Sequence, residues 1–312
     1  MLSIYNKSKK LPLVSIIMTC FNGEEFLEKA IQSILNQTYS NWELIFFDNN
    51  SNDSSKKILE KFKDKRIKYY KNNKKTNLGE VRELSYNKCN GDFISFLDVD
   101  DTWVKNKLTE QVKVFLNPNI DLVFTNCFIL EERNMNNKNL YLRHNKIFNK
   151  KLYLEDILKS YYLDNPFTVW ITLMIRSSIL KQMNYVFNKK YHIISDFDLV
   201  MRLAEKNKIL GINKPLATYR MHNNNESYLH KKDQLIELRK WANTNKKKEI
   251  YLQSLVFKKF IDKVNYELIK IKIINNNYKN FFKSILNLRF ILNKIKILIV
   301  AIMLILNFKK FN

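Results

Sequence analysis

Short apolar runs alternate with helix-like segments through the first 130 residues, and this alternation most limits what the chain can fold into. The runs contain few polar residues and are rich in β-branched and aromatic side chains, which is typical of strands covered on both faces. Between them, apolar residues recur at helical spacing. We therefore expect an α/β fold with a mostly parallel sheet flanked by helices. The strands are expected at residues 14–18, 42–47, 67–70, 93–97 and 122–128.

Polar clusters follow three of these strands directly, at Thr19–Asn22, Asp48–Asp53 and Asp98–Asp101. In a parallel sheet the carboxyl ends of the strands lie at one edge, and ligands bind there. The placement of the clusters predicts a ligand site at that edge.

The third cluster is strongly acidic, because Asp98, Asp100 and Asp101 lie within four residues. Carboxylates this close repel each other, and a hard divalent cation relieves the repulsion. Mg²⁺ and Mn²⁺ usually take one or two protein carboxylates and complete their shell with water and phosphate oxygens. The cluster therefore predicts a metal site that holds a diphosphate. The alternative is a capped helix start, where Asp is also common.

The charge of the chain is concentrated near its C-terminus. The formal net charge is +24, and residues 231–312 contain 19 Lys and Arg against 5 Asp and Glu. A basic helical tail of this kind suits an anionic membrane surface better than nucleic acid, which we do not expect as a partner. Residues 297–306 are uninterruptedly apolar but too few to span a bilayer. We expect a membrane-surface segment at 288–310, with an ordinary core helix as the alternative.

The three cysteines, Cys20, Cys89 and Cys127, have no metal-binding spacing. Their odd number argues against a disulfide framework and indicates a reducing compartment. The apolar stretch near the N-terminus lacks a cleavage site and continues as strand and helix, so we do not expect a signal peptide. A cytoplasmic protein, peripheral at the inner face of the cell membrane, fits these features.

Over residues 12–225 the chain resembles the family 2 glycosyltransferases of the GT-A (Rossmann-like) fold. The stretches that carry the resemblance are VSIIMTCFNGEEFLEKAIQSILNQTYSNWELIFFDNNSND, NLGEVRELSYNKCNGDFISFLDVDDTWVKNKL, SDFDLVMRL and PLATYRMHNNNES. It implies an inverting enzyme that uses Mn²⁺ or Mg²⁺. Such an enzyme transfers a sugar from a nucleotide diphosphate donor, a UDP-sugar by family habit, to a saccharide or lipid-linked saccharide acceptor in cell-surface polysaccharide or glycolipid synthesis.

The resemblance also implies which residues bind the donor. Asp48 contacts the base or ribose, and Asn49 occupies a position where the family usually has a second Asp. Arg82 supports the nucleotide, with a surface ion pair on a helix as the alternative. Asp98 lies toward the ribose and Asp100 nearest the metal, while Asp101 assists or caps a helix. The loop after the first strand lines the nucleotide pocket with Thr19, Phe21 and Asn22.

Two later motifs complete the implied site. In SDFDLVMRL, Asp196 matches the catalytic base of inverting members, with Asp198 as a supporting residue; an N-cap at the start of a helix is the alternative for Asp196. In YRMHNNNES, His222 resembles a histidine near the metal or phosphates; a loop histidine with no ligand role is the alternative. Arg220 is expected to meet a phosphate. Trp103 and Trp170 are either sugar-stacking platforms or core aromatics.

We expect two domains, a catalytic domain at 1–227 and a basic helical region at 228–312. Two other functions remain open. One is a non-catalytic, membrane-associated protein that binds nucleotide sugars. The other is a sugar nucleotidyltransferase, which would normally show a Gly-rich, basic loop after the first strand. The loop here, TCFNGEE, has one Gly and two acids.

Overall fold

The computed structural model describes residues 11–134, 137–144, 151–163, 169–206, 208–275 and 281–308. The chain forms two compact units. Unit 1 contains Met1–Tyr153 and Phe167–Asn225, and unit 2 contains Leu154–Pro166 and Glu226–Asn312. Unit 2 thus includes a short segment from the middle of the sequence. The predicted domain boundary after residue 227 stays a prediction.

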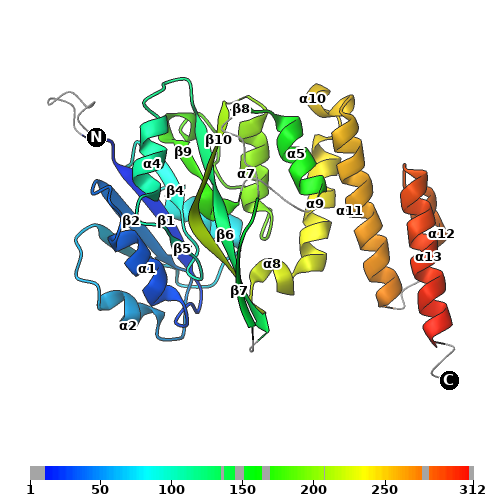
Figure 1. The fold of residues 1–312 in the computed structure, drawn as a ribbon, viewed down its shortest axis with the longest axis horizontal. Coiled ribbons are helices and arrows are strands. Elements are labelled where there is room, and N and C mark those ends of the chain that lie inside the picture. The colour runs from blue at the N-terminus through cyan, green and yellow to red at the C-terminus, as the bar shows by residue number, and fades with distance from the viewer. Residues whose placement is uncertain are drawn as a thin grey trace. The chain divides into compact units, whose positions relative to one another are not determined.

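Unit 1 is built on one sheet whose strands run in the order β3-β2-β1-β4-β9-β6-β10-β5, with β7 paired to β6 and β8 to β10 (Figure 1). Strands β1, β2, β3, β4, β6 and β10 share one direction, and β5, β7, β8 and β9 run against them. The predicted mostly parallel α/β fold is confirmed. The strands are β1 (Val14–Cys20), β2 (Trp42–Asp48), β3 (Ile67–Lys71), β4 (Phe93–Phe96), β5 (Thr102–Trp103), β6 (Leu122–Asn134), β7 (Asn137–Leu142), β8 (Lys151–Leu152), β9 (Met174–Arg176) and β10 (Ile209–Met221).

The apolar runs become strands because both faces of the sheet are covered. All seven residues of β2 are buried, as are all but one of β1. The strand order reverses at β1, since β2 and β3 lie on one side of it and β4 on the other. This reversal is where α/β sheets bind ligands. The helices of this unit are α1 (Leu27–Leu35), α2 (Ser55–Glu60), α3 (Leu78–Tyr86), α4 (Lys107–Val114), α6 (Ser177–Leu180) and α7 (Ser195–Ala204), with a 3₁₀ turn η1 (Trp170–Thr172).

Residues 131–142 differ from the sequence-based expectation. The sequence of residues 131–165 is polar and irregular and predicts loop and short helix, whereas β6 continues to Asn134 and pairs antiparallel with β7. Leu140 and Tyr141 of β7 are exposed. A strand pair that leaves the covered part of the sheet needs no apolar alternation, so the usual strand signal is missing.

Unit 2 is helical. Trp241 is fully buried at the centre of an aromatic cluster with Tyr251, Phe257 and Phe260, at centroid distances of 5.7, 6.2 and 6.3 Å. Across the described residues, no helix combines the length and apolar character needed to cross a membrane. The helices are α5 (Leu154–Tyr162), α8 (Glu226–Leu229), α9 (Lys231–Asn245), α10 (Glu249–Leu252), α11 (Leu255–Ile274), α12 (Phe281–Leu286) and α13 (Ile291–Phe308).

A buried glutamate ties the amino ends of the central strands together. Glu43 of β2 accepts hydrogen bonds from Ser15 Oγ (2.5 Å), the Asn90 amide (2.7 Å) and Lys68 Nζ (2.5 Å). Its side chain is 6% exposed. Although burial of the Glu43 carboxyl works to raise its pKa, the bonds from Lys68, Ser15 and Asn90 outweigh burial and lower the pKa. The charged form of Glu43 therefore stabilises the fold.

We expect Glu43→Gln to lower the free energy of unfolding by about 2 kcal/mol at pH 7.5, because the amide lacks the charge that these donors face. A carboxyl whose pKa is lowered by folding stabilises the protein above its unfolded pKa and loses that effect as the pH falls through its folded pKa. The difference between wild type and Glu43→Gln should therefore shrink below about pH 4.5. Urea unfolding of both proteins at pH 7.5 and below about pH 4.5 measures this difference in the free energy of unfolding. Glu60→Gln, in an exposed pair with Lys56, should change little at either pH. Equal stability of Glu43→Gln and wild type at pH 7.5 would contradict this prediction.

Candidate active site

The loops that follow β1 and β2 are joined by hydrogen bonds. The amide of Asn22 donates to Ser51 Oγ (3.0 Å), and Asn22 Oδ1 accepts from the Asn52 amide (3.0 Å). Asn22 and Asn50 both have left-handed backbones, with φ of 52° and 69°. Asn adopts this conformation more readily than most residues. Asn22, predicted to line the donor site, thus shapes the loop with its side chain.

Asp48 and Asn49, predicted to bind the nucleotide, are buried at the end of β2. Asp48 accepts from the Ser51 amide (2.7 Å) and from the Tyr69 hydroxyl (2.9 Å). Asn49 Oδ1 accepts from the Thr76 amide (3.0 Å), and Asn49 Nδ2 donates to the Thr76 carbonyl (2.8 Å). The Asn49 amide therefore fixes the segment between β3 and α3.

Thr19 and Phe21, also predicted at the donor site, lie at the end of β1 and just beyond it. Thr19 is half-buried, whereas the Phe21 side chain is 41% exposed. Lys75 Nζ lies 3.6 Å from the centre of the Phe21 ring. A cation above an exposed aromatic face places positive charge and a flat apolar surface at the same edge of the sheet.

Arg82 is buried, so the alternative of a surface ion pair is wrong. Its Nη1 donates to Ser195 Oγ (2.7 Å), its Nη2 lies 3.8 Å from Asp98 Oδ1, and its guanidinium lies 4.5 Å from the centre of the Trp170 ring. Arg82 Nε is buried without a hydrogen-bond partner among the described residues. Arg82 thus joins the end of β4 to the start of α7.

The three carboxylates after β4 are crowded, as the sequence predicts. Burial, together with the charges of Asp100 and Asp196, raises the pKa of Asp98 against the lowering effect of Arg82. Burial and the neighbouring carboxylates also raise the pKa of Asp101 well above its ordinary value. Asp101 Oδ1 accepts from the Arg220 amide (2.7 Å), but its buried Oδ2 has no partner among the described residues. Negative charge here is only partly compensated by protein groups.

Residues from the end of β10 reach Asp100 across more than 120 positions of sequence. His222 Nε2 lies 3.0 Å from Asp100 Oδ2, and Asn225 Nδ2 donates to the same oxygen (3.1 Å). His222 Nδ1 accepts from the Asn224 amide (3.2 Å), so the proton of a neutral ring is on Nε2 and points to Asp100. A metal ligated by His222 Nε2 would take the place of that proton.

Arg220 is buried behind Asp100 and contacts the backbone there. Its Nε donates to the Asp100 carbonyl (2.9 Å), its Nη1 pairs with Glu132 of β6, and its guanidinium lies 4.7 Å from the centre of the Phe26 ring. The Arg220 side chain is 9% exposed. Its Nε and Nη1 are thus engaged by protein groups, which suits positioning of the Asp100–Asp101 backbone.

The residues around Asp100 suit a divalent cation. Among the described residues no group of three or more His, Cys, Asp and Glu side chains is already gathered as a metal site. However, carboxylate and imidazole ligands meet at Asp100 and His222, and the buried Asp101 Oδ2 close by has no hydrogen-bond donor among the described residues. Two protein ligands are enough for Mn²⁺ or Mg²⁺ when phosphate oxygens and water supply the others.

Asp196 lies in the first turn of α7 and is half-buried. Ile194 is the cap residue and makes no side-chain capping bond, so the N-cap alternative for Asp196 is wrong. Asp196 is close enough to Asp98 for its negative charge to raise the pKa of the Asp98 carboxyl. Asp198 points elsewhere and pairs with Arg202 Nε at 2.9 Å, which secures α7 to the segment before it.

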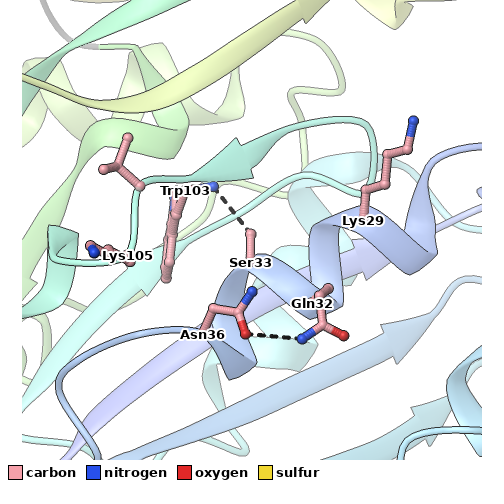
Figure 2. Close-up of a pocket in the computed structure, with 7 residues that line it drawn as sticks. Lys29, Gln32, Ser33, Asn36, Trp103 and Lys105 are labelled. Carbon is pink, nitrogen blue, oxygen red and sulfur yellow. Dashed lines mark hydrogen bonds between the residues drawn. The ribbon is translucent and has the colours of Figure 1, made fainter.

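The two candidate stacking tryptophans are core residues. Trp170 stacks on Phe96 at 3.8 Å, and Trp103 Nε1 donates to the Ile171 carbonyl (2.9 Å). Trp103 also borders a hollow of about 500 Å³ between α1 and β5, where Trp103 N donates to Ser33 Oγ (Figure 2). Apart from Trp103, no candidate site residue lines this hollow. Its walls come from Lys29, Gln32, Ser33, Asn36, Trp103, Val104 and Lys105.

Sequence reasoning missed several residues of the site. Asn225 donates to Asp100, and Glu132 pairs with Arg220. Ser195 accepts from Arg82, and Tyr69 donates to Asp48. Asn225 lies within the matched motif MHNNNES, so the sequence placed it near the site but did not indicate its bond to Asp100. Ser195 opens the matched motif SDFDLVMRL, but nothing there indicates its bond to Arg82. Nothing local in the sequence marks Glu132 or Tyr69.

The sheet, its reversal at β1 and the acidic strand end define a nucleotide-sugar-dependent glycosyltransferase of the GT-A fold. The sequence model described as glycosyl transferase family 2 matches residues 15–183. The chain belongs to this family, and it transfers a sugar from a nucleotide-sugar donor to a saccharide acceptor.

Individual proteins agree with this assignment. The chain is 32% identical over 202 residues to the Escherichia coli UDP-Glc:alpha-D-GlcNAc-diphosphoundecaprenol beta-1,3-glucosyltransferase WfgD, covering 64% of this chain and 73% of that one. S. aureus TarS 1–349 in complex with UDP-GlcNAc has a TM-score of 0.60 at 15% identity, covering 87% of this chain and 88% of TarS 1–349. The Pyrobaculum calidifontis mannosyltransferase PcManGT, in complex with GDP-Man and Mn²⁺, has a TM-score of 0.57 at 13% identity, covering 96% and 81%.

Proposed function

We propose that this protein is a metal-dependent, inverting glycosyltransferase that uses a UDP-sugar donor and a lipid-linked saccharide acceptor in the synthesis of a cell-surface glycan. The observation that carries the proposal is the cluster at the end of β4. There Asp100 meets His222 and Asn225, while Arg82 joins Asp98 to the start of α7. The name of WfgD supports UDP as the nucleotide and a diphosphoundecaprenol-linked acceptor. The TarS complex also supports UDP.

The metal ligands in this proposal are Asp100 and His222, with Asp98 nearby. A divalent cation, when bound, neutralises the charge that develops on the leaving diphosphate. Asn225 orients Asp100, and Arg220 holds the backbone of Asp100 and Asp101 in place. Outer hydrogen bonds of this kind commonly set the geometry of metal ligands. The Mn²⁺ complex of PcManGT supports a metal in this fold.

The nucleotide lies, in this proposal, at the ends of β1 and β2. Phe21 and Thr19 line the pocket, and Asn22 shapes its wall. Asp48 and Asn49 are proposed to contact the ribose and base, and the bonds from Asn72 Nδ2 and the Thr76 amide to Asn49 Oδ1 hold this part of the site in place. The Arg82 guanidinium is buried and forms an ion pair with the more exposed Asp98 carboxylate. Arg82 is therefore proposed to act on the nucleotide through Asp98.

Asp196 is the proposed catalytic base. The acceptor hydroxyl loses its proton to the Asp196 carboxylate while the acceptor oxygen forms a bond to the anomeric carbon. On the opposite face of the sugar, the bond from that carbon to the diphosphate oxygen breaks, so the configuration inverts. Holding acceptor and donor in line supplies much of the acceleration. Asp198 contributes by fixing α7 through Arg202.

A donor panel tests the proposal. With Mn²⁺ and an undecaprenyl diphosphate-linked sugar, we expect one UDP-sugar to release nucleoside diphosphate much faster than any GDP-sugar. The same donor should be hydrolysed slowly without acceptor. Tight binding of a UDP-sugar with no released UDP would instead support the non-catalytic nucleotide-sugar-binding protein. A folded sample that neither binds nor turns over any sugar nucleotide would overturn the proposal.

A further inference from the structure

Helix α13 has one packed side and one open side. Ile297 and Ala301 are buried in a cluster with Ile269 and Ile273 of α11 and with Leu288. Six other large aliphatic side chains within residues 291–302 are instead exposed. Their exposed fractions are 71% for Ile291, 66% for Leu292, 47% for Ile295, 40% for Leu298, 48% for Ile299 and 55% for Ile302.

These six side chains, hereafter the apolar stripe, follow the spacing of one helix face. Their positions recur at one, four, seven, eight and eleven residues after Ile291, which is the pattern of an amphipathic helix. Soluble proteins rarely leave so many large aliphatics together in water, and such patches mark protein or membrane contact sites. The sequence hides this division, because both sides of α13 are apolar.

A buried aspartate fixes which side of α13 is open. Asp262 of α11 is 1% exposed and accepts from the Arg289 amide (2.5 Å) and from Asn293 Nδ2 (2.5 Å). These bonds attach the start of α13 to α11 and set its rotation. The apolar stripe is therefore presented by the fold of unit 2 and does not depend on a frayed helix end.

Positive charges border the stripe on both sides. At about 100° per residue, Lys294 lies about 40° outside one margin of the stripe and Lys296 about 40° outside the other. From Ile291 to the last residue the sequence contains no Asp or Glu. Lysines at this position can bury their methylene stems along an apolar surface while the ammonium groups reach anionic groups.

We propose that the apolar stripe of α13 docks on a lipid bilayer that contains anionic headgroups, with the helix lying in the plane of the interface. An apolar face flanked by lysines matches an acyl boundary beneath negative headgroups. A second copy of the chain fits less well, because a symmetric contact would bring the same lysine rows together. This inference is independent of the proposed transfer reaction.

Vesicle flotation of the full-length protein tests the proposal without any sugar nucleotide. We expect binding to phosphatidylcholine vesicles that contain about 40% phosphatidylglycerol, and weak binding to phosphatidylcholine alone. Leu292→Glu/Leu298→Glu should reduce binding by on the order of 10²-fold or more, because two leucines leave the acyl boundary. Lys294→Gln/Lys296→Gln should reduce it about 30-fold at low salt.

Matched variants separate this surface from general charge and hydrophobicity. Leu252→Glu/Leu255→Glu changes two leucines of unit 2 that are 57% and 56% exposed, and it should bind vesicles like wild type. Circular dichroism and thermal unfolding establish that each variant is folded. Equal loss in both leucine pairs, or unchanged binding of Leu292→Glu/Leu298→Glu, would overturn the proposal. A wild-type dimer that this variant converts to monomer, with vesicle binding unchanged, would overturn it in favour of a subunit interface.

Discussion

Asp196→Asn is expected to fold like wild type and to lose turnover by on the order of 10²-fold or more, because an amide cannot accept the acceptor proton. The change should leave α7 intact, since Asp196 is not its capping residue and the cap makes no side-chain bond. Donor affinity should also be kept, because Asp100, His222 and Arg82 are unchanged. The measurements are kcat for the matched donor and acceptor, and the Kd of the sugar nucleotide by calorimetry.

Asp233→Asn is the matched control for this prediction. Asp233 also lies in the first turn of a helix, α9, and its side chain is 63% exposed. Both variants lose one acidic group near a helix N-terminus, an effect of about 0.3–1 kcal/mol on stability. Only Asp196→Asn should lose turnover. Near-wild-type turnover of Asp196→Asn, or a matching loss in Asp233→Asn, would reject Asp196 as the base.

Asp100→Asn is expected to reduce turnover by on the order of 10³-fold and to weaken Mn²⁺-dependent donor binding, because it removes the charged ligand at the centre of the proposed metal site. The variant should stay folded, since the Asn side-chain oxygen can still accept from His222 Nε2 and Asn225 Nδ2. Chelation of the wild type should lower its activity to the level of this variant, and added Mn²⁺ should restore only the wild type.

A graded comparison shows whether the effect comes from the metal. Asn225→Ala leaves the carboxylate but removes a hydrogen bond that orients it, and such outer contacts are typically worth 10–100-fold in affinity or activity. Asn225→Ala should therefore lie between wild type and Asp100→Asn, and excess Mn²⁺ should partly recover it. Full activity under chelation, or unchanged Mn²⁺ affinity in Asp100→Asn, would contradict a metal at Asp100.

Arg82 and His222 show where the sequence-based reading of the site stopped. The sequence placed both in matched motifs. It left open that Arg82 forms a surface ion pair and that His222 is a loop histidine with no ligand role. In the structure Arg82 is buried between Trp170 and Ser195, and His222 contacts Asp100 directly. Their partners lie 113 and 122 residues away, and no local pattern encodes such pairings.

The sequence by itself determined the α/β class, the core strands and the placement of three polar clusters at strand ends. It could do so because strand burial and turn chemistry leave local periodic signals. Only the tertiary structure decided that β6 and β7 form a paired extension, that α5 groups with the C-terminal helices, and that one side of α13 stays open. Each of these depends on which distant segment covers a given face, and packing between distant segments leaves no local pattern.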